Sequence, residues 1–231
     1  MNKNIQNLEN EIGYVFNDKE LLMQALTHSS YVNDRKMDKN LCNERLEFLG
    51  DAILEMTSSE FLYSEYPEKD EGELTKLRAS LVSETPLAAV AGEIGLGEYL
   101  YLGHGEERTG GRTRYSVTSD AVEAVIGAIY LDGGIEPARA FVRKYILNDI
   151  ENKKLFHDSK TVLQEIVQKY HRGTLTYRLV KEEGPDHDKK YGMNALIDEK
   201  IIGYGEGRTK KAAEQQAAYS AIKSLNKNAE R

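Results

Sequence analysis

The sequence predicts an all-α domain followed by a small α+β domain, and three observations support this fold class. Apolar side chains recur at three- and four-residue spacing through the first two thirds of the chain, as in amphipathic helices. Beyond residue 170 they alternate instead, as in strands. The net charge also changes, from −10 over residues 1–157 (17 basic, 27 acidic) to +3 over residues 158–231 (14 basic, 11 acidic). The chain therefore contains two modules that differ in composition and in their expected partners.

The first module is expected to be helical throughout. Its periodic segments lie at residues 20–27, 43–65, 73–82, 86–94, 118–132 and 135–149. Pro67 follows the second segment, and Gly133 and Gly134 follow the fifth, as is typical of helix ends. No strand is expected before residue 150. The Gly- and Arg-rich stretch 103–114 is expected to be a mobile loop.

A charged and weakly patterned segment divides the two modules. The domains are expected at residues 1–150 and 158–227, with 151–157 as the linker. The second module carries a helix at 161–170, strands at 175–180, 191–197 and 200–204, and an alanine-rich helix at 210–225. The predicted order is therefore α-β-β-β-α.

Composition excludes membrane-spanning and secreted proteins. The chain has no run of about 18 apolar residues, the length that a membrane-spanning helix needs. Its polar N-terminus lacks the apolar region of a secretory signal. The single cysteine, Cys42, excludes an intramolecular disulfide framework and fits a reducing compartment, so a cytoplasmic location is expected. Cys42 is expected to be a small buried thiol rather than a nucleophile, because no base is arranged for it.

An acidic stripe is the sharpest chemical feature of the first module. Glu44, Glu47 and Asp51 share one face of a helix, and Glu55 extends this face by a turn. No lysine or arginine lies three or four residues from Glu47 or Asp51, and like charges at that spacing repel by roughly 0.2–0.5 kcal/mol per pair. A solvated helix face is the ordinary interpretation of such a stripe. The apolar Phe48 beside it is unusual for a face that contacts only solvent.

A second pair of carboxylates, Asp120 and Glu123, lies on a later helix. Gly127 shares their face and permits another backbone or a ligand to approach closely. Two helices that each present such a pair can converge on hard divalent cations. Ligands that are all oxygen favour Mg²⁺ or Mn²⁺ over zinc, and the five histidines show no spacing typical of zinc ligands.

Four blocks of sequence carry a resemblance to a known family. Residues 43–51 (NERLEFLGD) resemble the signature of bacterial ribonuclease III, and residues 25–30, 70–72 and 120–128 match the same family in the same order. The resemblance implies a homodimeric endonuclease that hydrolyses double-stranded RNA with Mg²⁺, for which Mn²⁺ substitutes. It further implies 5′-phosphate and 3′-hydroxyl ends, short 3′ overhangs, and the processing of ribosomal RNA precursors, messenger RNAs and other structured transcripts.

The resemblance also assigns roles to individual side chains. The catalytic, metal-binding carboxylates would be Glu47, Asp51, Asp120 and Glu123. The residues at the subunit contact and the RNA cleft would be Glu44, Phe48 and Glu71, with Phe48 entering a socket on the partner subunit. Metal held by the carboxylates would acidify the attacking water and would let an acidic cleft accept RNA.

The second module resembles a double-stranded-RNA-binding domain over residues 158–225. By this resemblance, the side chains that contact the duplex would be Thr161, Gln164, Glu165, His187, Arg208, Lys210 and Lys211. The alternating Gly203, Gly205 and Gly207 could be mistaken for a dinucleotide-binding loop. No parallel βαβ unit surrounds them, so no nucleotide cofactor is expected.

Two alternatives stay open from the sequence. A non-catalytic RNA-binding protein could retain this fold to shape or protect duplexes, and loss of a metal-position carboxylate would favour it, but all four are present. A structural dimerisation protein that does not bind RNA would leave the basic second module unexplained.

Overall fold

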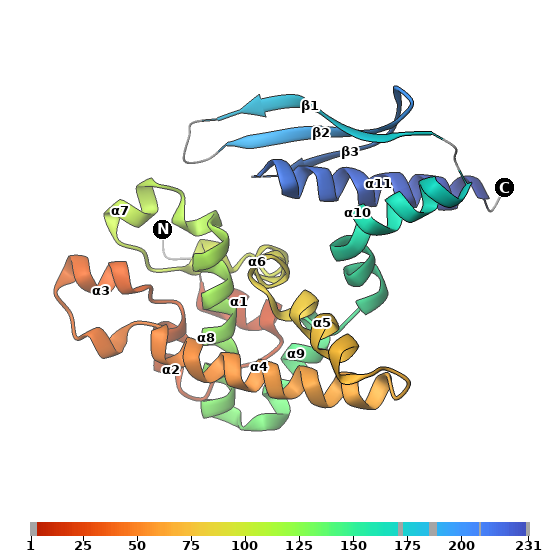
Figure 1. Ribbon diagram of the computed structural model, residues 1–231. Helices are drawn as coiled ribbons and strands as arrows, with labels where there is room; N and C mark the ends of the chain where they lie inside the picture. The colour runs from red at the N-terminus through yellow and green to blue at the C-terminus, as the bar shows by residue number, and fades with distance from the viewer. Residues whose placement is uncertain (1–3, 171–172, 185–188, 208, 230–231) are drawn as a thin grey trace. The chain divides into compact units, whose positions relative to one another are not determined.

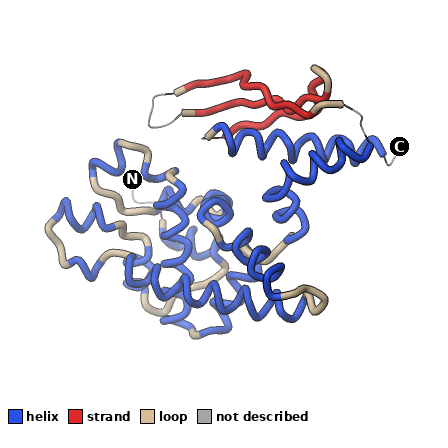
Figure 2. Tube along the Cα trace, in the orientation of Figure 1, coloured by secondary structure: helices blue, strands red, loops and turns tan. Residues whose placement is uncertain are grey.

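The computed structural model describes residues 4–170, 173–184, 189–207 and 209–229. It divides the chain into two compact units, Met1–Asn148 and Asp149–Arg231. Within the described residues, the first unit consists of helices with one isolated bridge, and the second contains a sheet with two helices (Figure 1, Figure 2). The predicted fold class is therefore confirmed.

The first unit is a bundle of short and medium helices. They are α1 (Ile5–Ile12), α2 (Lys19–Ala25), α3 (Ser29–Arg35), α4 (Glu44–Glu65), α5 (Glu71–Val82), α6 (Glu84–Glu93), α7 (His104–Arg108), α8 (Tyr115–Gly133) and α9 (Ile135–Tyr145). Three short 3-10 turns join them, η1 (Lys39–Leu41), η2 (Leu96–Tyr99) and η3 (Gly111–Thr113). The six predicted helices are present, with ends that differ by a few residues.

Helix α8 forms the centre of the first unit. Every residue from Val117 to Ile129 is buried except Asp120 and Glu123, which are half-buried. A helix that is apolar on nearly all sides is a core helix, and α8 packs against α2, α4, α6 and α9. Asp120 and Glu123 are thus the only positions between Val117 and Ile129 that neighbouring helices leave partly accessible to solvent.

Sequence periodicity missed three helices, α1, α3 and α7. All three are short, and tertiary contacts hold α3. Its N-cap is His28, whose ring Nδ1 accepts a hydrogen bond from the backbone N–H of Ser30. The isolated bridge from Thr27 to Tyr101 ties the start of α3 to the segment that precedes α7. Histidine is not among the preferred capping residues, so the helix start carried no recognisable signal.

The prediction of a mobile loop at 103–114 is wrong. This segment forms α7 and η3, and Arg112 and Arg114 make contacts that fix it. The Arg112 guanidinium makes two contacts of 2.6 Å with the Glu107 carboxylate and donates to two backbone carbonyls beside η2. Arg114 pairs with Glu106. Glycine and arginine are typical of loops, but here the arginines supply hydrogen bonds that fix the backbone.

The second unit has both helices on one face of a three-stranded antiparallel sheet (Figure 1). Its elements are α10 (Ile150–Tyr170), β1 (Leu175–Glu183), β2 (Lys190–Ile197), β3 (Lys200–Gly207) and α11 (Lys210–Ala229), and the strand order is β1-β2-β3. The segment 151–157, predicted as a linker, is the first part of α10. Phe156 stacks edge-on against Tyr219 of α11 at 5.4 Å, which anchors this charged segment as helix.

Strand β3 lies directly on α11 because three of its residues are glycines that face this helix. A Cβ atom at Gly203 would lie 2.3 Å from the carbonyl oxygen of Ala217, and one at Gly205 would lie 2.2 Å from the backbone nitrogen of the same residue. Only glycine allows so close an approach. The glycine alternation that imitates a dinucleotide-binding loop is therefore a packing feature.

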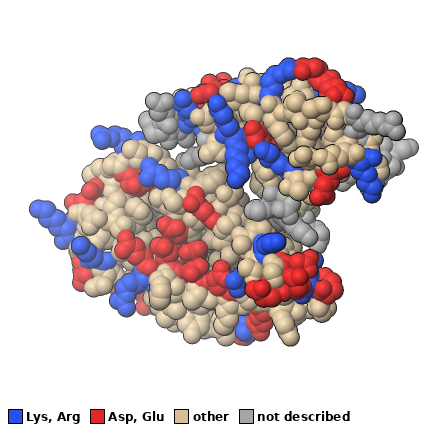
Figure 3. All heavy atoms as spheres, viewed as in Figure 1, with Lys and Arg blue, Asp and Glu red and all other residues tan. Residues whose placement is uncertain are grey.

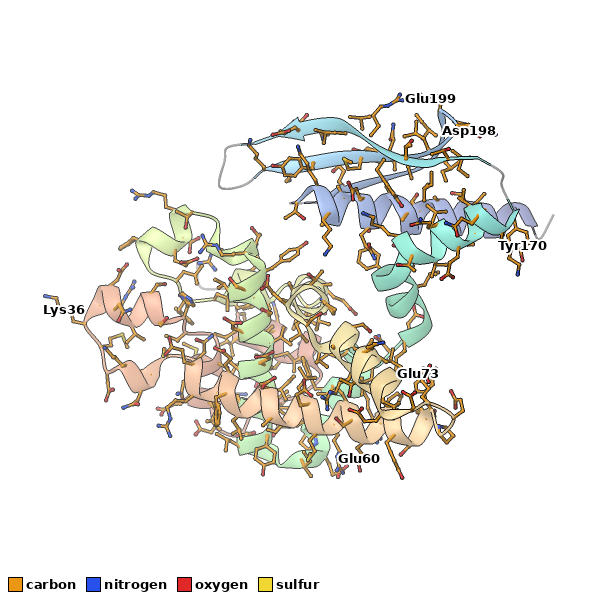
Figure 4. All side chains as sticks on the ribbon, viewed as in Figure 1. Lys36, Glu60, Glu73, Tyr170, Asp198 and Glu199 are labelled. Carbon is orange, nitrogen blue, oxygen red and sulfur yellow. The ribbon has the colours of Figure 1, made fainter. Side chains whose placement is uncertain are left out.

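A tight turn joins β2 to β3. Asp198 and Glu199 form this turn with positive φ angles of 45° and 70°, as two-residue hairpins require (Figure 4). Asp198 accepts a hydrogen bond from the backbone N–H of Thr174 at 2.8 Å, and Glu199 pairs with Arg178 on β1. These contacts tie the turn to the start of β1.

Candidate active site

Helices α4 and α8 cross with their backbones in contact. A Cβ atom at Gly50 on α4 would lie 1.8 Å from the carbonyl oxygen of Glu123 on α8. A Cβ atom at Gly127 would lie 2.3 Å from the carbonyl oxygen of Leu46. Each glycine thus removes the side chain that would hold the helices apart. The crossing brings the acidic residues on either side of Gly50 next to the acidic pair that precedes Gly127.

Four carboxylates meet at this crossing and are called the carboxylate cluster: Glu47, Asp51, Asp120 and Glu123. Burial of its carboxyl raises the pKa of Glu123 to about 8. Neighbouring carboxylates add to the shift, in decreasing order Asp51, Glu47, Asp120 and Glu55. Figure 3 shows acidic side chains gathered over the crossing of α4 and α8.

The other members of the cluster share this field. Burial raises the pKa of Glu47 to about 6, and Asp120, Glu44 and Asp51 raise it further. Burial likewise raises the pKa of Asp120; the carboxylate of Glu84 adds to this, whereas a hydrogen bond with Ser119 and the charge of His28 act in the opposite direction. Mutual repulsion of this kind is relieved by a cation.

The donor set fits a hard divalent cation. All its ligand atoms are oxygen, two side chains come from each helix, and burial together with their mutual repulsion raises the pKa of Glu47 to about 6 and that of Glu123 to about 8. Among the residues that the structure describes, no three His, Cys, Asp or Glu side chains already stand as a metal-ligand set. The residues that would bind Mg²⁺ or Mn²⁺ are the four members of the cluster.

The remaining predicted residues of the first unit lie on α4 and α5. Glu44 is exposed in the first turn of α4, and its charge contributes to the raised pKa of Glu47. Phe48 is 81% exposed. Glu71 is exposed at the start of α5 and accepts a hydrogen bond from Thr75 of the same helix at 3.1 Å. Its part in the site stays a prediction.

Sequence reasoning missed two charged neighbours of the cluster. Glu84, at the start of α6, raises the pKa of Asp120. Arg78 on α5 forms an ion pair of 2.7 Å with Glu55. The sequence around each residue shows no sign of this role, because α5 and α6 come close to the cluster only when they pack against α4 and α8.

The predicted RNA-binding side chains lie on two helices of the second unit. Exposed positions on α10 are Thr161, Gln164 and Glu165, whose spacing of three and four places them on one face. Lys210 and Lys211 are exposed in the first turn of α11. Cations near the amides of a helix N-terminus suit phosphate groups. His187 and Arg208 lie outside the described residues.

No helix in the described part of the chain is long and apolar enough to span a bilayer.

Both units match known families. Residues 18–150 match a family described as Ribonuclease-III-like, and residues 159–225 match the Double-stranded RNA binding motif.

The chain is similar along nearly its full length to proteins named Ribonuclease 3. That of Pelotomaculum thermopropionicum is 49% identical over 218 residues, which are 93% of this chain and 90% of the relative. That of Clostridium botulinum is 47% identical over 226 residues, 96% of this chain and 97% of the relative. That of Staphylococcus haemolyticus is 46% identical over 221 residues, 95% of this chain and 90% of the relative.

Solved structures resemble the first unit. The nuclease domain of ribonuclease III from Campylobacter jejuni superposes with a TM-score of 0.58 at 44% identity, covering 62% of this chain and 94% of that one. A second structure of the same domain, with a TM-score of 0.58 at 43% identity, covers 62% of this chain and 96% of that one, and is described as flexible in a region involved in dimer formation.

Proposed function

Because this chain belongs to the ribonuclease III family, we propose that it is an endoribonuclease that hydrolyses double-stranded RNA at the carboxylate cluster between α4 and α8. The observation that supports this site is the glycine-mediated crossing, which joins two acidic pairs from distant parts of the chain. The second unit supports the choice of substrate, since its family binds double-stranded RNA.

The cluster holds the catalytic divalent cation, Mg²⁺ with Mn²⁺ as a substitute. When bound, the ion supplies an acidified water and positive charge for the departing 3′ oxygen, which yields 5′-phosphate and 3′-hydroxyl ends. Glu47, Asp51, Asp120 and Glu123 provide the negative charge that retains the ion. Neutralised in this way, the cluster no longer repels the phosphate backbone of RNA. Burial and the neighbouring carboxylates raise the pKa of Glu123 to about 8, and a bound cation would favour its ionised form.

The second unit binds the duplex and delivers it to the cluster. Exposed side chains of α10 contact minor grooves, and the lysines at the start of α11 contact phosphates across the intervening major groove. Cleavage leaves short 3′ overhangs. Ribosomal RNA precursors and other structured transcripts are the proposed substrates.

The purified chain should cleave a labelled RNA duplex in Mg²⁺, and cleavage should stop when EDTA removes the metal. No other group in the cluster can offset the negative charge of its four carboxylates. Addition of excess Mg²⁺ should restore cleavage. A DNA duplex of the same sequence is the matched control and should remain intact. Tight duplex binding without cleavage in Mg²⁺ or Mn²⁺ would instead identify a non-catalytic RNA-binding protein.

Replacing both Lys210 and Lys211 by alanine should weaken duplex binding. Each lost phosphate contact removes close to one counterion, so the slope of log K against log salt should fall by roughly two units at most. Replacing both Lys200 and Lys223 by alanine removes the same charge from two other exposed positions of the second unit. This control should leave the slope of log K against log salt unchanged. Equal salt slopes for the two double variants would contradict the assigned RNA face.

The functional enzyme is a homodimer in this proposal. Phe48 is an 81% exposed aromatic side chain beside the carboxylate cluster, at the position that the family resemblance assigns to the subunit contact. Phe48→Ala should therefore shift the protein toward monomer in analytical ultracentrifugation at micromolar concentration. Tyr170→Ala, which removes a 68% exposed aromatic from the second unit, serves as the control. A wild-type protein that sediments as a monomer would contradict the dimer.

A further inference from the structure

Arg78, on a neighbouring helix, forms an ion pair with Glu55 at the end of the acidic stripe. The Nε atom of Arg78 on α5 lies 2.7 Å from Oε2 of Glu55 on α4. Its Nη1 donates a hydrogen bond of 2.7 Å to the hydroxyl of Ser59, which in turn donates to the backbone carbonyl of Glu55 at 2.6 Å. The contact to two groups one turn apart fixes the direction of the Glu55 side chain.

Glu55 is the carboxylate outside the cluster that could extend toward its cation. It follows Asp51 by one helical turn on the same face of α4. Its charge is among those that raise the pKa of Glu123, so the two groups interact across the helix crossing. Without a partner, Glu55 would be a fifth carboxylate free to turn toward the same cation.

A fifth carboxylate would be harmful to the proposed chemistry. Mg²⁺ keeps several waters and takes only a few carboxylates, because it requires near-octahedral geometry. An additional carboxylate would occupy a position that water or a phosphate oxygen needs, and it would hold the ion more tightly while reducing its net positive charge.

We infer that Arg78 is a positioning residue that holds Glu55 away from the cation and thereby limits the site to four carboxylates. The inference rests on the function proposed above. A purely structural ion pair between side chains that are 34% and 37% exposed would stabilise the fold only weakly, and its loss would leave kcat unchanged. Metal affinity and kcat, measured together, therefore separate the two roles.

The test compares Arg78→Gln, Glu55→Gln and the double variant in the full chain. Mn²⁺ binding is measured by calorimetry without RNA, and kcat is measured on an RNA duplex in saturating Mg²⁺. Arg78→Gln frees Glu55 and should tighten Mn²⁺ binding roughly three- to tenfold, which is the range expected for one charge at a partly solvated site. The same variant should have a lower kcat. Glu55→Gln leaves Arg78 unpaired and should weaken Mn²⁺ binding by a similar factor. The double variant should return close to wild type in both measurements.

Two further variants control for folding and for charge. Arg78→Lys keeps the cation and should retain wild-type Mn²⁺ affinity. Glu60→Gln removes a carboxylate from the same helix, where it pairs with Arg139 at 2.9 Å, and should leave Mn²⁺ binding unchanged (Figure 4).

Equal Mn²⁺ affinity in Arg78→Gln and wild type, or a change of the same sign in both single variants, would overturn the inference while leaving duplex cleavage by the wild type intact. A wild-type chain that binds no Mn²⁺ and cleaves no duplex would overturn the proposed function and this inference together.

Discussion

Glu123→Gln is expected to reduce duplex cleavage by orders of magnitude and to leave duplex binding intact. Glutamine has nearly the shape of glutamate but lacks its charge. The cluster would lose one of its four negative charges, the carboxylate whose pKa is raised to about 8. The occupancy of the metal site, the acidity of the metal-bound water and the stabilisation of the transition state should all decrease. Most binding free energy should survive, because phosphate contacts of the second unit supply it.

Gel shift and cleavage on the same RNA duplex measure the two effects separately. Glu65→Gln, which neutralises an exposed residue at the end of α4, should bind and cleave as wild type does. Cleavage by Glu123→Gln near the wild-type rate in Mg²⁺ would remove Glu123 from the catalytic set.

The stability of the same variant checks that the chain still folds. A carboxyl whose pKa is raised from 4.5 to about 8 binds its proton more tightly in the folded than in the unfolded chain. Its ionisation therefore opposes folding as the pH rises from 4.5 to about 8. Without metal, Glu123→Gln should be at least as stable as wild type at pH 8 in thermal unfolding. A lower midpoint would point to misfolding as the cause of lost activity.

Gly50→Ala is expected to destabilise the first unit and abolish cleavage. The added Cβ would lie 1.8 Å from the carbonyl oxygen of Glu123, and because this atom is backbone, no rotamer change can relieve the clash. The two helices must separate, at a cost of about 1–3 kcal/mol or more for overpacking. This exceeds the gain of roughly 0.5–1 kcal/mol that alanine usually brings to a helix.

Gly92→Ala is the matched control. Gly92 lies within α6, and a Cβ atom there would meet nothing within 4 Å. This variant should raise the free energy of unfolding by about 0.5–1 kcal/mol and cleave normally. Thermal unfolding and duplex cleavage of both variants provide the comparison. An unchanged melting temperature and full activity in Gly50→Ala would show that the helices do not depend on this contact.

Local spacing was sufficient to predict the fold class and the two acidic pairs, and the family resemblance joined these pairs into one site. The acidic pairs lie three or four residues apart on helices, and a glycine on the same face as Asp120 and Glu123 indicates a close approach. These features repeat within a turn or two of helix, so one sequence contains them entirely. The roles that the family resemblance assigns to the four carboxylates remain to be tested by mutation.

Features that depend on packing between distant segments could not be predicted. Arg78 on α5 pairs with Glu55 next to the cluster, and Glu84 on α6 acts on Asp120, and nothing in their own segments marks them. The arginines of 103–114 resemble those of a loop until their carbonyl partners are known. The charged segment 151–157 resembles a linker until Phe156 is seen against Tyr219.

The contact between Gly50 and Glu123 has a consequence for how this family can evolve. Main-chain atoms are in contact where α4 and α8 cross at the cluster, so any side chain at Gly50 or Gly127 would force the two helices apart. The two glycines therefore allow no substitution that preserves the separation. Substitutions should be nearly absent at these two positions within the family, and an engineered enzyme that is repacked for thermostability must keep both glycines.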